Sequence, residues 1–183
     1  MPNLDLTESR HLSTQLIAFL VGNFPVTEFE AWVHQTPELR TVLNQPDYDE
    51  LLTIRAEHPN AHLAYESILN PYIDWAQYEK EQLAELLMAI IWEDNAPAAM
   101  NRLRELFLKG YDFLAVLVTQ HSHQLVATTS TKTRTPAQQE ALMANLYPKL
   151  RAEANRVLVQ LVAGKICFTG TYSSEGCPDY IEQ

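Results

Sequence analysis

The chain has 183 residues, of which 46% are apolar and 20% charged, so wholesale disorder is excluded and a sizeable core is expected. Five glycines are too few for a barrel or sandwich with many tight turns, and no apolar run approaches the roughly 18 residues of a membrane span. The net charge is −10, and the excess of acids lies in the first half, which argues against direct nucleic-acid binding because phosphates would be repelled.

The chain begins without the basic and apolar segments of a secretion signal, so we expect a cytoplasmic protein. Apolar residues at helical spacing then predict a first helix over residues 8–21. Thr27 and Glu30 match a capping box and predict the start of a second, short helix. Pro37 and Pro46 each follow a polar residue and predict two further helix starts.

The middle of the chain carries the longest helical pattern. A helix is predicted over residues 61–69, and Asp74 is placed to cap a long helix over 75–92. Another helix is expected from Pro97 to Gly110. The short apolar run over 111–118 fits a helix or a strand, and we favour a helix.

The last third begins with a polar stretch over 120–135, which predicts an exposed, flexible loop. A helix follows, and Pro148 is expected to kink or break it before a final helix that ends at Gly164.

After that helix, residues 165–172 alternate polar with apolar side chains and predict a short strand or extended arm. Two arrangements are possible for this segment: it pairs with residues 125–127, or it packs as an extended tail. Residues 173–183 are expected to be loosely held. The fold class is therefore mainly α, a single irregular multi-helix domain over 1–183 with a short C-terminal strand or extended arm.

The sequence carries no recognisable catalytic or cofactor motif. His58 and His62 have the spacing of a zinc-protease helix, but Pro59 stands where its glutamate would be. Cys167 and Cys177 lack the two-residue gap of a redox motif or zinc knuckle, and we expect free thiols. We therefore expect no catalytic residue, no cofactor and no metal.

Two groups of residues are candidates for binding a protein partner. One is a cluster of carboxylates, and the other joins aromatic residues at helical spacing to an acid, the composition of interface hot spots. Helix-dipole stabilisation or solubility is the alternative for the acids, and core packing for the aromatics. The candidate partner-binding residues are Asp47, Asp49, Glu50, Tyr72, Trp75, Tyr78 and Glu79.

Several segments together resemble small helical bacterial proteins of the toxin-immunity type, which occur beside polymorphic or contact-delivered toxins. The resemblance covers the chain in outline and rests mostly on core aromatics and turn glycines. The segments are Phe29-Glu30-Ala31-Trp32-Val33, Thr36-Pro37-Glu38-Leu39, Tyr48 with Leu51-Leu52, Gly110-Tyr111-Asp112-Phe113-Leu114, Gly164-Lys165-Ile166 and Thr169-Gly170-Thr171-Tyr172.

The resemblance implies a non-enzymatic immunity or inhibitor protein that binds and neutralises a cognate bacterial toxin domain. An acidic and aromatic surface would suit a toxin with a basic active-site cleft, such as a nuclease, with carboxylates standing where phosphates would sit. Two alternatives stay open. One is a chaperone or adaptor for a secreted effector, and the other is an enzyme with an unrecognised site.

Overall fold

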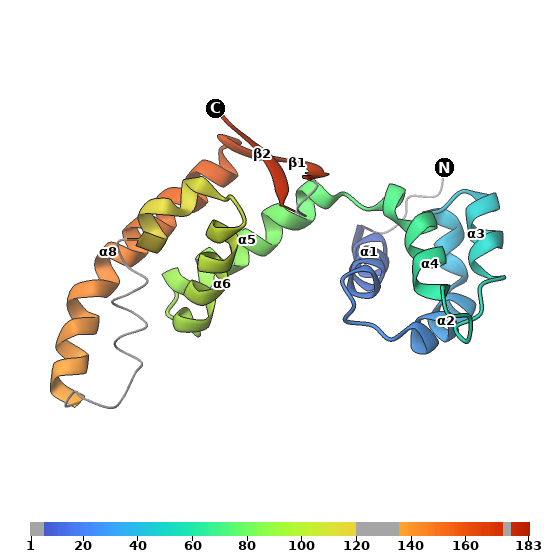
Figure 1. Cartoon of the computed structure of the whole chain (residues 1–183), viewed down its shortest axis with the longest axis horizontal. Coiled ribbons are helices and arrows are strands. Elements are labelled where there is room, and N and C mark those ends of the chain that lie inside the picture. Colours follow the sequence, from blue (N-terminus) through green and yellow to red (C-terminus); the bar gives the residue numbers. More distant parts are fainter. Residues whose placement is uncertain (1–5, 120–135, 174–176) are drawn as a thin grey trace. The chain divides into compact units, whose positions relative to one another are not determined.

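The computed structural model describes residues 6–119, 136–173 and 177–183. It confirms a mainly α chain with a short C-terminal strand (Figure 1). Residues 115–119 are also helical and directly follow the 3-10 helix at Asp112–Leu114. With η marking a 3-10 helix, the elements are α1 (Leu6–Leu20), α2 (Val26–Gln35), η1 (Pro37–Thr41), α3 (Gln45–Leu51), α4 (Ala61–Leu69), η2 (Asn70–Tyr72), α5 (Trp75–Ile91), α6 (Ala96–Leu108), η3 (Asp112–Leu114), α8 (Pro136–Val162), β1 (Ile166–Tyr172) and β2 (Pro178–Glu182).

The contacts group the chain into two compact units, residues 1–73 and 74–183. The physical reason is that the buried apolar side chains form two separate clusters. One is built from α1 to α4, and the other from α5, α6, α8 and the strands. Each unit therefore has its own hydrophobic core, the usual property of a domain.

The core of the first unit is aromatic at its centre. The rings of Phe19 and Phe29 stack with their centroids 3.8 Å apart, and Tyr65 of α4 packs edge-on against Phe29 at 5.1 Å. All three side chains are fully buried. This packing joins α1, α2 and α4, because each of the three helices supplies one ring.

The predicted capping box at Thr27 and Glu30 is wrong. The residue before α2 is Pro25, and no side chain caps that helix. The Glu30 carboxylate instead accepts a hydrogen bond from the backbone N–H of Ala56 at 2.8 Å and pairs with Arg55 at 3.1 Å. The Glu30 carboxylate, which the local pattern predicted to cap α2, is thus bonded to residues that are distant in the sequence. These bonds to Ala56 and Arg55 lower the pKa of Glu30.

In the second unit, α5 packs against α6, α8 and β1. The predicted cap of α5 is confirmed, because the Gln77 N–H donates to the Asp74 carboxylate at 2.9 Å. The break considered at Pro148 is absent: α8 runs through this residue. A proline removes one helical hydrogen bond, while buried Leu146 and Leu150 keep the same helix face on the core to either side of it.

The predicted strand over 165–172 is confirmed as β1, and its partner is the segment expected to be a loose tail. β1 and β2 run antiparallel with Ile166 opposite Glu182 and Phe168 opposite Tyr180. The expectation of a loosely held tail is therefore wrong over 178–182, since backbone pairing and the packing of Tyr180 hold these residues. Residues 120–135, which include the alternative partner 125–127 and the expected loop, lie outside the described residues.

None of the described helices combines the length and the apolar character needed to cross a bilayer.

Candidate functional surfaces

The structure joins two of the sequence candidates, Asp47 and Tyr72, in one hydrogen-bonded group. Asn44 caps α3 by accepting from the Asp47 N–H at 2.9 Å. The Tyr72 hydroxyl donates to the Asp47 carboxylate at 2.5 Å and accepts from the Asn44 side chain at 2.6 Å. The hydrogen bond to Asp47 raises the pKa of Tyr72. Asp47 is therefore held by its own unit and is only partly exposed.

The other two acids of α3 point their charge to solvent. Asp49 and Glu50 are exposed, and neither forms an ion pair with a lysine or arginine in the part of the chain that the structure describes. Arg55 pairs with Glu30, and Arg40 lies over the ring of Tyr48, which is itself part of α3. The α3 carboxylates thus carry negative charge at the surface, with the Arg40 charge beside the same helix.

The remaining candidates, Trp75, Tyr78 and Glu79, belong to the second unit, where they form a group with β1. Trp75 packs edge-on against Tyr78 and Tyr172, with ring centroids 5.6 and 6.3 Å away. The Glu79 carboxylate accepts one hydrogen bond from Tyr172 and one from Tyr111, each at 2.9 Å. This arrangement ties the start of α5 to the hairpin, the role expected of core aromatics.

Burial is the main cause that raises the pKa of both Tyr111 and Tyr172, and the negative charge of Glu79 adds to it. Both hydroxyls therefore stay protonated and act as donors. Such a pair of neutral donors stabilises the Glu79 carboxylate without transferring a proton. The two hydrogen bonds give Glu79 a structural role, because each carboxylate oxygen already accepts from a tyrosine of its own unit.

An exposed row along α5 ends at its C-cap residue, Trp92, and was not predicted from the sequence. Glu81, Glu85, Met88 and Trp92 follow one another at intervals of four, three and four residues, which places them on one helix face. Trp92 is 78% exposed and Met88 is 40% exposed. The helical spacing was readable from the sequence, but exposure was not, because tryptophan and methionine are ordinarily assigned to a core.

The first two residues of this row, Glu81 and Glu85, are acidic. In the described ranges no lysine or arginine pairs with Glu81 or Glu85, and Glu81 accepts only from the Gln77 side chain, at 2.6 Å. Beside Trp92, Glu93 is bound by Arg151 at 2.6 Å. We call Glu81, Glu85, Met88 and Trp92 the α5 face. It combines a large exposed aromatic with free carboxylates.

Metal and nucleophile candidates from the sequence do not converge. His58 accepts a hydrogen bond from the Asn60 N–H, and His62 lies 3.8 Å from Glu66. Within the described residues no three histidine, cysteine, aspartate or glutamate side chains are grouped closely enough to hold a metal ion. Cys167 and Cys177 are free thiols.

Comparisons of the chain with known protein families, with curated proteins and with solved structures find no match.

Proposed function

We propose that this protein binds a basic partner protein through the α5 face and has no catalytic role of its own. The observation that carries the proposal is Trp92, 78% exposed one helical turn from Met88. Exposed apolar side chains of this size mark interaction sites when they are grouped and bordered by polar residues. Tryptophan is also among the residues that contribute most binding energy at protein interfaces.

The charge of the chain supports a basic partner. Residues 1–73 contain ten acidic and three basic residues, and residues 74–183 contain 13 and 10. Asp49 and Glu50 on α3, together with Glu81 and Glu85 on α5, attract a basic protein at long range and raise its rate of association. Once the partner is bound, Trp92 and Met88 supply the apolar contact.

The form of binding that we propose is inhibition of a cognate bacterial toxin in the cytoplasm. The resemblance to toxin-immunity proteins and the free carboxylates support it. A toxin that acts on nucleic acid has a basic cleft, and carboxylates presented on a rigid helix would occupy the place of phosphates. Inhibition would then be competitive with the toxin's substrate.

The experiment is to express the whole chain with the product of its neighbouring open reading frame and to purify through a tag on one of them. The proposal predicts that both proteins elute together and that the chain relieves the growth defect caused by its neighbour. A complex without toxicity would favour a chaperone or adaptor instead. If Trp92→Ala and wild type retain the neighbour equally, the α5 face is not the binding surface.

A further inference from the structure

In the part of the chain that the structure describes, β2 pairs with a strand along one of its edges, and no strand pairs with the other edge. The Gln183 N–H donates to the Lys165 carbonyl at 2.8 Å, so these residues form a hydrogen-bonded pair of the antiparallel ladder. Bonded and non-bonded pairs alternate along such a ladder. Tyr180 therefore forms a non-bonded pair with Phe168, and Glu182 forms one with Ile166. The N–H and C=O groups of Tyr180 and Glu182 point away from β1.

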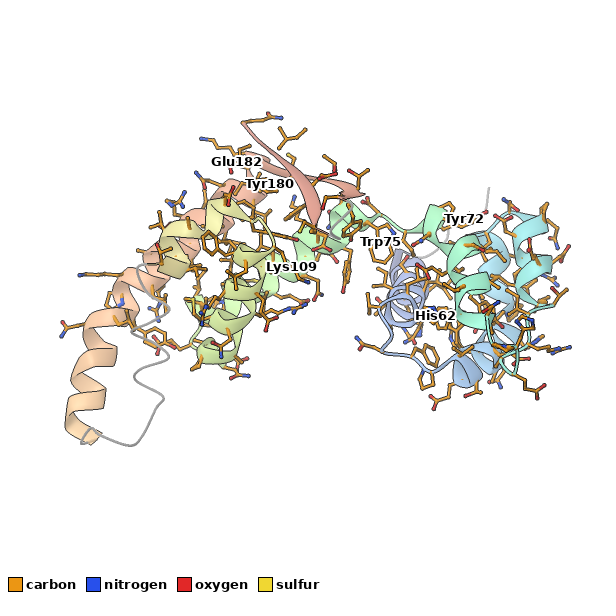
Figure 2. The ribbon with its side chains drawn as sticks, in the orientation of Figure 1. His62, Tyr72, Trp75, Lys109, Tyr180 and Glu182 are labelled. Atoms are coloured by element: carbon orange, nitrogen blue, oxygen red, sulfur yellow. The ribbon has the colours of Figure 1, made fainter. Side chains whose placement is uncertain are left out.

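β2 also lines a groove. Its volume is about 460 Å³, and its walls are formed by β2 on one side and by the turn after α6, at Lys109 and Gly110, on the other. Tyr180 is held in place, since its hydroxyl accepts a hydrogen bond from the Asp112 N–H at 3.1 Å. Figure 2 labels Tyr180 and Glu182 on the C-terminal hairpin and Lys109 at the end of α6.

We propose that this groove accepts an extended, basic segment of a partner protein, which adds to β2 as a third strand. Strand addition takes its affinity from backbone hydrogen bonds and its selectivity from the side chains that face the edge. Here those side chains include Asp179 and Glu182, both exposed and without an ion pair among the described residues. The Asp179 carboxylate also accepts a hydrogen bond from the Thr171 hydroxyl of β1 at 2.9 Å, and one base, Lys109, lines the same groove. With two acids and one base the lining remains negative, so it favours a strand that carries lysine or arginine.

The same charges oppose a second copy of the chain as the occupant. Antiparallel pairing of two β2 strands would bring Asp179 and Glu182 of both copies to one seam, and like charges across strands are destabilising. Charged residues and proline are the usual protection of an edge strand against self-association. Pro178 limits pairing to the rest of β2, because it has no N–H to donate.

The edge also specifies the order of residues in the partner. An antiparallel strand would place basic residues opposite Glu182 and Asp179, and an apolar residue opposite Ile181, which is 54% exposed on the outer face. The position opposite Tyr180 accepts a small polar residue. The expected pattern is Lys-Val-Thr-Lys, read along the partner. This surface is separate from the α5 face, so the inference stands without the proposed function.

The test uses the whole chain labelled with ¹⁵N and a capped peptide, Thr-Lys-Val-Thr-Lys-Val-Thr. We expect the peptide to slow hydrogen exchange of the Tyr180 and Glu182 amides. The Ile181 amide, already bonded to β1, is expected to keep its rate. The variant Glu182→Pro removes one outward N–H together with the carboxylate and leaves the bonds to β1, whereas Glu182→Gln removes only the charge, so any loss in Glu182→Pro beyond that in Glu182→Gln reports the N–H. Both are expected to weaken peptide binding by at least about fivefold, the effect of roughly one hydrogen bond or charge contact.

A peptide with glutamate in place of lysine is the matched control and is expected to leave exchange unchanged. Unchanged exchange of Tyr180 and Glu182 with the lysine peptide at about 5 mM, where even weak binding near 1 mM would register, overturns the proposal. Equal protection by both peptides overturns the charge argument. Protection that rises with protein concentration in the absence of peptide would show that a second copy, and not a basic partner, occupies the edge.

Discussion

The hydroxyl of Tyr172 in β1 lies 2.9 Å from one carboxylate oxygen of Glu79 in α5, and the hydroxyl of Tyr111 lies 2.9 Å from the other. One carboxylate thus connects three segments that are far apart in the sequence. Hydrogen bonds to a charged acceptor are stronger than neutral ones, and more so where water is excluded. This link holds the hairpin against the start of α5.

Removing one of the two donors is expected to destabilise the second unit. Tyr111→Phe deletes the buried hydroxyl and leaves an oxygen of Glu79 without its partner. We expect a loss of about 1.5–3 kcal/mol in the free energy of unfolding, the usual range for a hydrogen bond to a charged group. Urea denaturation followed by circular dichroism measures it.

The control is Tyr78→Phe, because the Tyr78 hydroxyl has no hydrogen-bond partner in the part of the chain that is described. Its ring packs against Trp75, and that contact survives the substitution. We expect a change of less than about 0.5 kcal/mol, as for other substitutions that remove no buried interaction. Equal losses in the two variants would show that Glu79 does not depend on Tyr111.

Gly170 is required where β1 crosses α5. Its φ is +76°, and a Cβ added there would lie 3.3 Å from the backbone nitrogen of Ala76, which cannot move without disturbing the helix. Gly164 has a similar φ of +71°, but an added Cβ would meet nothing closer than the Cys167 sulfur at 3.9 Å. Substitutions at the two glycines therefore distinguish the cost of the left-handed backbone, which both share, from the cost of the close contact, which only Gly170 has.

We expect Gly164→Ala to cost about 1–2 kcal/mol for the left-handed conformation alone. Gly170→Ala should cost that amount and at least about 1 kcal/mol more, in the range of overpacking. The free energies of unfolding of both variants, measured side by side, test this difference. If Gly170→Ala is as stable as Gly164→Ala, β1 does not approach α5 as closely as described.

Tyr65 makes the stability of the first unit sensitive to high pH. Burial raises its pKa from 10 to about 12. The folded state therefore keeps the phenolic proton after the unfolded chain has lost it. The contribution of this proton is complete below pH 10 and is lost as the pH rises from 10 to 12.

The measurement is the urea midpoint of wild type and Tyr65→Phe between pH 8 and pH 12. The phenylalanine variant lacks the titrating group, so its midpoint should fall less steeply above pH 10. Other tyrosines with raised pKa contribute equally to both proteins and cancel in the comparison. Parallel curves would mean that the Tyr65 hydroxyl is not desolvated in the folded state.

The α3 carboxylates are predicted to act on the rate of association with a basic partner. Asp49→Asn with Glu50→Gln removes two charges and spares Asp47, whose carboxylate holds Tyr72. We expect slower association and a weaker dependence of its rate on salt, with little change in dissociation. Stopped-flow mixing with the purified partner over a salt series gives both rates. An unchanged salt dependence would remove α3 from the steering surface.

Local signals predicted the elements well where one residue determines the outcome. The Asp74 cap and the helix over 61–69 follow from short-range chemistry, and the structure has both. Glu30 shows the limit. Its spacing from Thr27 matches a capping box, but its carboxylate accepts a hydrogen bond from the N–H of Ala56, which is distant in the sequence. The pairing of β1 with β2 was missed for the same reason, since register depends on tertiary neighbours.

The sequence predicted which residue types the candidate surfaces contain, but not which of these residues are exposed. The spacing of Trp75, Tyr78 and Glu79 suggested a shared face, and the three residues do lie together. Whether a face is exposed depends on which elements cover it, and β1 packs on this one through Tyr172. Trp92 is four residues from Met88 at the end of the same helix, yet nothing in the sequence distinguishes its exposure from burial.

The central claim, that the α5 face binds the partner, is tested most directly by the dissociation constant of the purified complex with Trp92→Ala. Leu108→Ala is the matched control, because Leu108 is also a large exposed apolar side chain, 73% exposed, on α6. We expect Trp92→Ala to weaken binding by about 30-fold or more, equivalent to about 2 kcal/mol, and Leu108→Ala to change it less than about twofold. An unchanged dissociation constant for Trp92→Ala, with the variant folded, would contradict this claim.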